Sequence, residues 1–97
     1  MSMYVSLVNW TEQGIKNFRD TKDRAEEFSK VVENSGGRVR EQLWTVGQYD
    51  MVCVAEFPDD ETAAAALLNA GSAGYIRSNT LRAFSGEEIG SIISRAS

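Results

Sequence analysis

The chain has 97 residues, of which 42% are hydrophobic and 25% charged, and its 10 Lys and Arg against 14 Asp and Glu give a formal net charge of −4. A chain of this length forms one compact domain around one hydrophobic core, so we predict a single domain over residues 1–97. The sequence contains no histidine, which excludes Ser-His-Asp and Cys-His hydrolase sites and histidine-ligated haem or zinc.

The acidic balance also limits the partners and the compartment. With a pI near 4.7 and no basic run, we expect no nucleic-acid partner, because phosphate binding needs clustered Lys and Arg. The single Cys53 lies in an apolar run and predicts a buried thiol in a reducing cytoplasm. Residues 1–10 alternate like a strand and lack the features of a signal peptide, and no apolar run approaches the roughly 20 residues that span a bilayer. We therefore expect a soluble, cytoplasmic protein with no membrane partner.

Residues 3–10 are rich in β-branched and aromatic side chains and predict the first strand. Thr11 is placed to cap a helical segment over residues 12–34. Gly14 weakens the helical pattern early, which predicts a short first turn followed by a main helix. The glycines at 36–37 end this helix with a left-handed cap.

Charged residues on the main helix stand four apart and predict two ion pairs, Asp20 with Arg24 and Glu26 with Lys30. Apolar residues recur every three or four positions and predict the face that packs on a sheet. These residues are Ala25, Phe28, Val31 and Val32.

Residues 38–46 and 51–57 predict two further strands, and the four residues between them suit a hairpin loop. The turn at 58–60 supplies a cap for a helix over residues 61–70. Residues 75–84 predict a fourth strand. Ser85 and Glu88 then form the S-x-x-E pattern of a capping box, which predicts a short C-terminal helix.

This order predicts an α+β fold, a ferredoxin-like βαββαβ domain with a four-stranded antiparallel sheet and an added C-terminal helix. The first and third strands carry apolar residues on both faces and are expected at the centre of the sheet. The helices can cover one face only. We expect the other face to expose Tyr, Trp and Val, and such an apolar patch predicts a homodimer that forms by face-to-face packing of two sheets.

Several segments together resemble the GYD-domain family over nearly the whole chain. The resemblance implies a ferredoxin-like subunit of the dimeric α/β-barrel superfamily, in which two sheets pack face to face. It implies no particular activity, because that superfamily includes cofactor-free monooxygenases, haem-binding enzymes and ligand-sensing domains. The segments that carry it are Tyr4-Val5-Ser6-Leu7-Val8-Asn9-Trp10-Thr11, Gly14, Gly47-Gln48-Tyr49-Asp50, Pro58-Asp59-Asp60-Glu61 and Thr80-Leu81-Arg82-Ala83-Phe84.

The loop Gly47-Gln48-Tyr49-Asp50 allows two interpretations. In the structural one, Gly47 takes a positive φ, Tyr49 packs against the end of the sheet and Asp50 bonds local backbone groups. In the functional one, Tyr49 and Asp50 line a ligand pocket at the mouth of the barrel.

Arg82 lies on a predicted edge strand, where charge often serves only to block further strand pairing. It shares a face with Thr80 and Phe84, and we expect it to form an internal ion pair with Asp50 or Glu56. The alternative is that its planar guanidinium binds an anionic ligand.

Asn9, Trp10 and Trp44 support an enzyme hypothesis, because cofactor-free oxygenases stabilise an enolate in an apolar cavity with such side chains. The same residues also suit a dimer interface and the ends of strands. The acidic cluster at 59–61 is expected to serve as a helix cap, so we expect no metal site and no cofactor.

The sequence thus predicts a non-catalytic small-molecule-binding or assembly module that forms a homodimer or a larger oligomer. The alternative is a cofactor-independent monooxygenase-like enzyme acting on a hydrophobic or aromatic small molecule, with catalytic residues unassigned. The candidate ligand-binding residues are Asn9, Trp10, Trp44, Tyr49, Asp50 and Arg82.

Overall fold

Four strands form one antiparallel sheet in the computed structural model, which describes all of residues 1–97. The order across the sheet is β2-β3-β1-β4, so the first and third strands are central, as predicted. The two edge strands are the more polar ones, which is how soluble proteins protect sheet edges. The strands are β1 (Ser2–Trp10), β2 (Arg38–Trp44), β3 (Met51–Phe57) and β4 (Ile76–Ala83).

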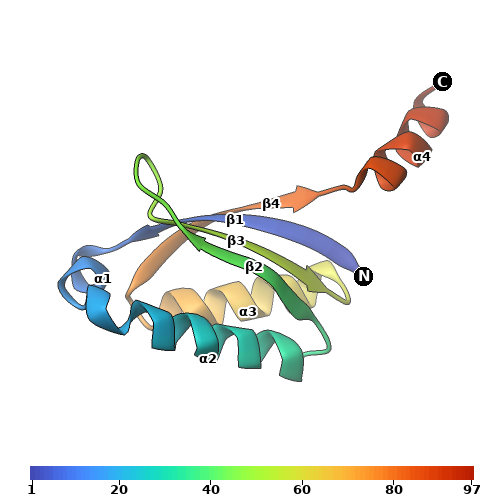
Figure 1. Cartoon of the computed structure of the whole chain (residues 1–97). Coiled ribbons are helices and arrows are strands. Elements are labelled where there is room, and N and C mark those ends of the chain that lie inside the picture. The colour runs from blue at the N-terminus through green and yellow to red at the C-terminus, as the bar shows by residue number, and fades with distance from the viewer.

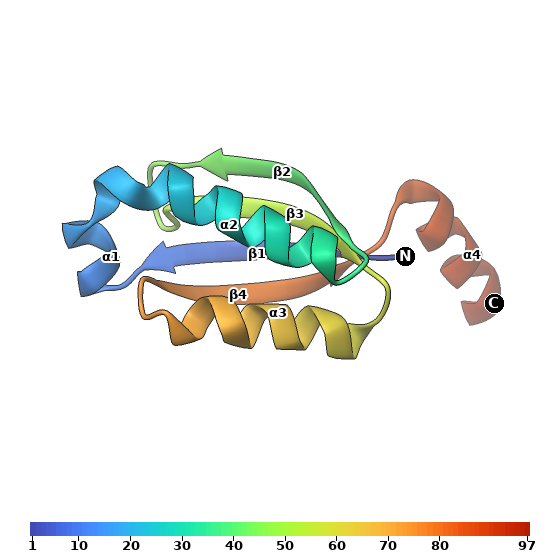
Figure 2. The same cartoon turned by 90° about the horizontal axis from the view of Figure 1, so that it is seen from below.

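The helices complete the βαββαβ order with one helix added at the C-terminus, which confirms the predicted α+β fold. Two long helices, α2 and α3, lie side by side across one face of the sheet (Figures 1 and 2). The C-terminal helix α4 projects beyond the end of the sheet (Figure 1). The helical elements are α1 (Glu12–Lys16), the short 3₁₀ turn η1 (Phe18–Asp20), α2 (Thr21–Asn34), α3 (Asp60–Ser72) and α4 (Gly86–Ala96).

Local sequence signals set the helix ends, as expected. The side chain of Thr11 accepts a hydrogen bond from the backbone N–H of Gly14 (3.1 Å) and caps α1. Ser85 and Glu88 form the predicted capping box of α4. Gly36, just past α2, has a φ of 93°, which is the left-handed conformation that glycine adopts without strain. No helix of the protein combines the length and the apolar character needed to cross a membrane.

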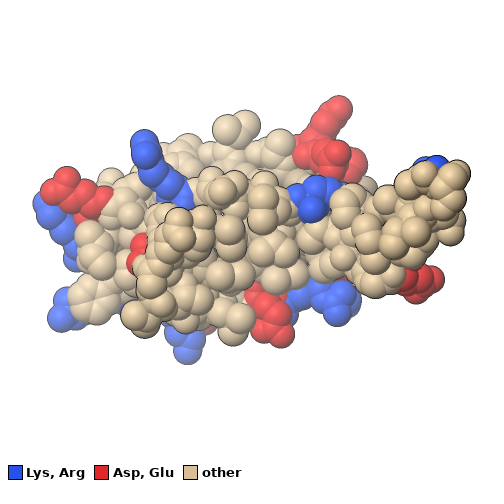
Figure 3. Space-filling model, turned by 90° about the horizontal axis from the view of Figure 1, so that it is seen from above, with Lys and Arg blue, Asp and Glu red and all other residues tan.

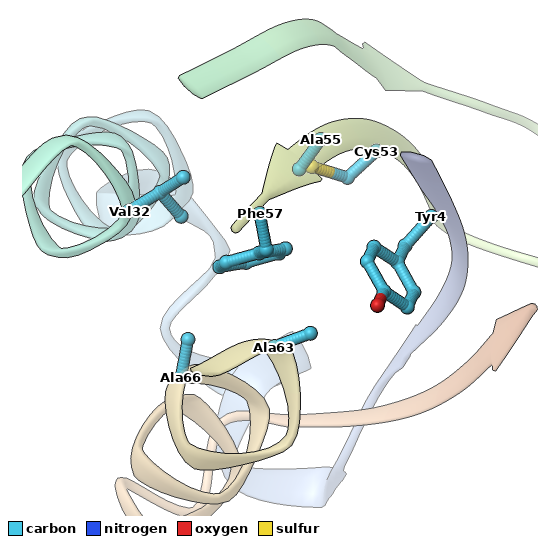
Figure 4. Close-up of a cluster of buried hydrophobic side chains, with 7 residues drawn as sticks. All are labelled: Tyr4, Val32, Cys53, Ala55, Phe57, Ala63 and Ala66. Atoms are coloured by element: carbon cyan, nitrogen blue, oxygen red, sulfur yellow. The ribbon is translucent and has the colours of Figure 1, made fainter. Parts of the chain in front are cut away.

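The helix-covered face of the sheet holds the hydrophobic core. Phe57 and Val32 are the large side chains that are completely buried, and Phe57 lies between the two helices (Figure 4). The ring of Tyr4 meets the ring of Phe57 edge-on, with centroids 5.7 Å apart. Helix α3 contributes only Ala63 and Ala66 to this cluster, so its contact with the sheet is made by small side chains.

The face that carries the aromatic residues differs from the expectation. Tyr4 is buried beneath the helices, and Trp10 and Trp44 share that side of the sheet, so the prediction that Tyr and Trp lie on the uncovered face was wrong. On the helix side the hydroxyl of Tyr4 donates to the Asp60 carboxylate at the start of α3. The uncovered face, hereafter the open face, carries aliphatic side chains instead: Val5, Leu7, Leu43, Val52, Val54 and Leu81.

The two ion pairs predicted on α2, Asp20/Arg24 and Glu26/Lys30, are not formed. Arg24 instead lies over the ring of Tyr75, 4.4 Å from its centroid. An exposed ion pair contributes little stability, whereas a guanidinium held against an aromatic face at a partly buried site gains more. Arg24 therefore faces the space between the helices, away from its neighbours on α2.

Candidate functional site

The structure gathers most of the predicted site residues at one end of the sheet, around Asp50. The carboxylate of Asp50 accepts a hydrogen bond from the backbone N–H of Trp10 (2.9 Å). The backbone N–H of Asp50 donates to the carbonyl of Val8, and that of Thr45 donates to the carbonyl of Asp50, each at 2.9 Å. Asp50 thus joins the β2–β3 loop to the end of β1, and its bonds reach a neighbouring strand rather than only its own turn.

Other predicted residues at this end lie on different sides of the sheet. The indole N–H of Trp44 donates to the hydroxyl of Thr21 on α2 (3.1 Å). Asn9 pairs with Arg77 across the strands and faces the opposite side. The carbonyl of Tyr49 accepts a hydrogen bond from the Thr45 hydroxyl (2.6 Å). Gly47 has the predicted positive φ, at 138°.

Arg82 lies at the other end of the sheet, where it pairs with Tyr4. The predicted ion pair with Asp50 or Glu56 was wrong: the nearest carboxylate is that of Glu88, with an N–O distance of 4.0 Å. The strand register separates Arg82 from Asp50 by the length of the sheet. The guanidinium of Arg82 lies 4.4 Å from the centre of the Phe84 ring.

Glu56 is paired with two arginines of β2 on the open side of the sheet. Its carboxylate lies 2.6 Å from Nε of Arg38 and 3.7 Å from Nη1 of Arg40. The hydrogen bond from Arg38 is the main reason that the pKa of Glu56 lies below its usual value. Glu56 is therefore paired with Arg38 and Arg40, whereas Arg82 lies closest to Glu88 in the C-terminal segment.

A cavity of about 570 Å³ lies on the helix-covered side, between α2, α3 and the sheet. Of the six predicted site residues, only Trp10 lines it. Small side chains explain the space: Ala70 and Ala73 line it from the end of α3, and Ser6 and Cys53 from the sheet. Such side chains are too short to close the gap between two helices that rest on the same sheet.

Arg24 is the main polar group of this cavity. Its Nη1 donates to the backbone carbonyl of Asn17 (3.1 Å), while its Nη2 is buried and has no hydrogen-bond partner. Tyr75 also lines the cavity and stacks against the guanidinium. The amide of Gln42, another lining residue, is already used, because its Nε2 donates to the carbonyl of Ala25 (3.0 Å).

Two side chains on this side of the sheet, Cys53 and Tyr4, have raised pKa values. Burial raises the pKa of the Cys53 thiol to about 11, so the thiol stays protonated and weakly nucleophilic at neutral pH. Burial also raises the pKa of Tyr4, with a further contribution from its hydrogen bond to Asp60. No three Cys, Asp or Glu residues come together where they could hold a metal ion.

Arg24 and Tyr75 line the cavity but were not among the site residues predicted from the sequence. A signal for Arg24 was present, because it stands four residues before Phe28 and seven before Val31, on the helical stripe that faces the sheet. Tyr75 had no such signal, since its position at the cavity depends on where α3 ends.

The fold and the cavity together define a ferredoxin-like α+β domain with a partly open cavity between its helices and its sheet. The sequence profile of the GYD domain matches residues 4–93. The chain therefore belongs to the GYD-domain family, as the resemblance implied.

Two known proteins are similar to this chain. A protein of Thermus thermophilus named "Glutamine synthetase and cystathionine beta-lyase binding protein" is 32% identical over 84 residues, which make up 86% of this chain and 88% of the relative. A crystal structure of a putative chlorite dismutase superimposes with a TM-score of 0.57 at 16% identity. The match covers 96% of this chain but 48% of that one, so this chain spans about half of its length. At this identity the likeness concerns the fold alone.

Proposed function

We propose that this GYD-domain protein is a non-catalytic binding module, which forms a homodimer through the open faces of its sheets and binds metabolic enzymes. The observation that carries the proposal is the uncovered apolar surface of the sheet. The name of the Thermus relative supports an enzyme as partner, and the two chains match over most of their lengths.

The aliphatic side chains of the open face form two adjoining rows across the sheet. Register places Leu43 beside Val52 and Val52 beside Leu7 in one row. The second row runs through Val54, Val5 and Leu81. Leu43 and Leu81, on the edge strands, are 52% and 48% exposed. The middle of this face is uncharged, and most charged side chains lie near its margins (Figure 3). A contiguous apolar surface of this kind is typical of an interface.

A second copy of the chain is the occupant that fits this face best. The loop between β2 and β3 rises at one end of the open face, and α4 projects at the other end on the same side (Figure 1). No residue of α4 is buried, although Ile89, Ile92 and Ile93 form an apolar edge that is 44%, 37% and 59% exposed. The apolar edge of this well-capped amphipathic helix has nothing beneath it in its own subunit, which favours packing against a partner chain. In the dimer, α4 would pack its isoleucines on the second subunit.

In such a dimer the helical layers of both subunits face outward. Their surfaces are then free to bind an enzyme, while the sheets form the shared core. The proposal that Asn9, Trp10, Trp44, Tyr49 and Asp50 also contact a small molecule at the dimer's edge stays a prediction. Arg82, at the far end of the sheet, would belong to a separate contact near α4.

The enzyme alternative has one supporting observation, the apolar cavity. Cofactor-independent oxygenation needs a group that removes a proton from the substrate, and the thiol of Cys53 is held protonated in this cavity. Oxygen uptake with a panel of hydroxylated aromatic compounds distinguishes the two functions. Turnover that is lost on substitution of cavity residues would establish the enzyme instead.

Light scattering on the purified protein tests the dimer. We expect a mass of twice 10.7 kDa for the native chain and a monomer for Val54→Lys, which places a charge in the centre of the open face. Leu68→Lys is the matched control, because Leu68 is 76% exposed on α3 and its substitution leaves the dimer intact. A native protein that is monomeric at micromolar concentration contradicts the proposal.

Enzyme binding is tested separately with purified glutamine synthetase and cystathionine β-lyase on a biosensor surface. We expect the native dimer to bind at least one of them. Failure to bind either enzyme, with the dimer intact, rejects the enzyme partner but not the assembly.

A further inference from the structure

We propose that the cavity between α2, α3 and the sheet binds a compact, largely apolar molecule that carries one uncharged hydrogen-bond acceptor, such as an aromatic ketone. Arg24 is the donor for that acceptor. This site goes beyond the dimer and the enzyme partner, because it lies on the opposite side of the sheet from the open face.

The size and the lining of the cavity suit a small organic molecule. Its volume of about 570 Å³ falls within the roughly 300 to 1,000 Å³ of typical ligand sites. Hydrophobic residues make up 12 of the 22 that line it, so the body of the ligand must be mostly apolar. Trp10 on β1, Phe28 on α2 and Tyr75 in the loop before β4 supply aromatic surfaces, which favours a flat ring.

The guanidinium of Arg24 is not fully hydrogen-bonded in this cavity. Its Nη2 is buried without a partner, and a buried donor on a charged group is costly to leave unpaired. The contact with Tyr75 and the bond to the carbonyl of Asn17 hold the guanidinium in place. Because Nη2 is covered, a ligand acceptor would complete its hydrogen bonding after a small shift of the guanidinium or of the atoms that cover it.

The charges around the cavity select an uncharged acceptor. Asp20, Asp23 and Glu27 line the same cavity from η1 and α2, and Arg24 is its single cation. Three carboxylates against one guanidinium repel a free carboxylate or phosphate. A carbonyl oxygen accepts from Arg24 without bringing a further negative charge into this field.

Calorimetric titration of the native protein with three naphthalene derivatives tests the proposal. The probes are a methyl naphthyl ketone, the naphthalene carboxylate of the same shape, and naphthalene itself. We expect the ketone to bind about tenfold more tightly than naphthalene, which corresponds to one hydrogen bond, and more tightly than the carboxylate. Equal affinity for ketone and naphthalene, tighter binding of the carboxylate, or no binding of any probe would overturn the proposal.

Two variants locate the binding. Arg24→Met keeps a long side chain without donors, and we expect the ketone to bind it no better than naphthalene. Arg19→Met is the matched control: Arg19 stacks on Phe18, with its guanidinium 4.7 Å from the ring centre, and does not line the cavity, so the ketone preference stays. Ala70→Leu fills the cavity and weakens all probes that bind the native chain. An unchanged preference for the ketone in Arg24→Met would show that Arg24 is not the hydrogen-bond donor. Light scattering serves as the control that the variants assemble like the native chain.

Discussion

The carboxylate of Asp50 accepts a hydrogen bond from the backbone N–H of Trp10 at 2.9 Å. The two residues stand 40 positions apart in the chain, and the bond ties the loop before β3 to the last residue of β1. This contact gives the aspartate of the Gly-x-Tyr-Asp loop a structural role. A ligand contact by the same side chain would have to use its remaining lone pairs.

We predict that Asp50→Ala lowers the free energy of unfolding by about 1.5 to 3 kcal/mol, because it removes a hydrogen bond to a charged acceptor and leaves the Trp10 N–H unpaired. Asp50→Asn keeps an acceptor oxygen at the same position, so we expect a smaller loss. Urea unfolding followed by circular dichroism measures both. Equal stability of Asp50→Ala and the native protein would show that water replaces the carboxylate at no cost.

Gly14 is required by close packing. A Cβ atom at Gly14 would lie 2.0 Å from the backbone carbonyl oxygen of Tyr75, and that carbonyl also accepts a hydrogen bond from the N–H of Thr11 (3.1 Å). We predict that Gly14→Ala destabilises the protein by about 1 to 3 kcal/mol or more, as overpacking does.

Gly71→Ala is the matched control for Gly14→Ala, because Gly71 lies in α3 and a Cβ there meets nothing within 4 Å. Helix propensity alone then predicts a gain of up to about 1 kcal/mol. Thermal unfolding of the two variants separates steric conflict from propensity. A loss of stability in both variants would mean that the contact with Tyr75 is not the cause.

The buried thiol of Cys53 predicts a loss of stability in alkaline solution. Burial raises its pKa from 9.0 to about 11, so between these values the unfolded chain releases the proton while the folded chain keeps it. Unfolding therefore becomes more favourable as the pH rises through this window. The contribution of Cys53 is fully present below pH 9 and amounts to about 3 kcal/mol at most.

Comparison with Cys53→Ala isolates this effect. We expect the free energy of unfolding of the native chain to fall more steeply between pH 9 and 11 than that of the variant. A thiol reagent at pH 8 should label Cys53 slowly in the folded protein and rapidly in guanidinium chloride. Parallel pH profiles for the two proteins would contradict the burial argument.

Much of the fold was predictable from local patterns. Apolar residues on both faces of β1 and β3 indicated the two central strands, and Thr11, Gly36 and the Ser85–Glu88 box marked helix ends that the structure reproduces. These features depend on residues that are close in sequence. The GYD segments added the family, which the sequence profile over residues 4–93 confirms.

The candidate site was less predictable, because it depends on register and on the space between helices. Alternation showed that β1 has two faces but not which one meets the helices, so Tyr4 and Trp10 were expected on the wrong side. Arg82 was expected near Asp50, although pairing with Tyr4 places it at the other end of the sheet. Arg24 was expected to pair with Asp20, whereas in the structure it contacts Tyr75, a residue 51 positions away that lies just after α3.

Four features could be predicted without the fold, because each follows from neighbouring residues or from composition: the order of elements, their caps, the central strands and the absence of histidine chemistry. Three other features became visible in the packed fold: the aliphatic character of the open face, the cavity and the unpaired nitrogen of Arg24. These features arise where segments that are distant in sequence come together. A short side chain such as Ala70 leaves a cavity only because other elements line the space opposite it.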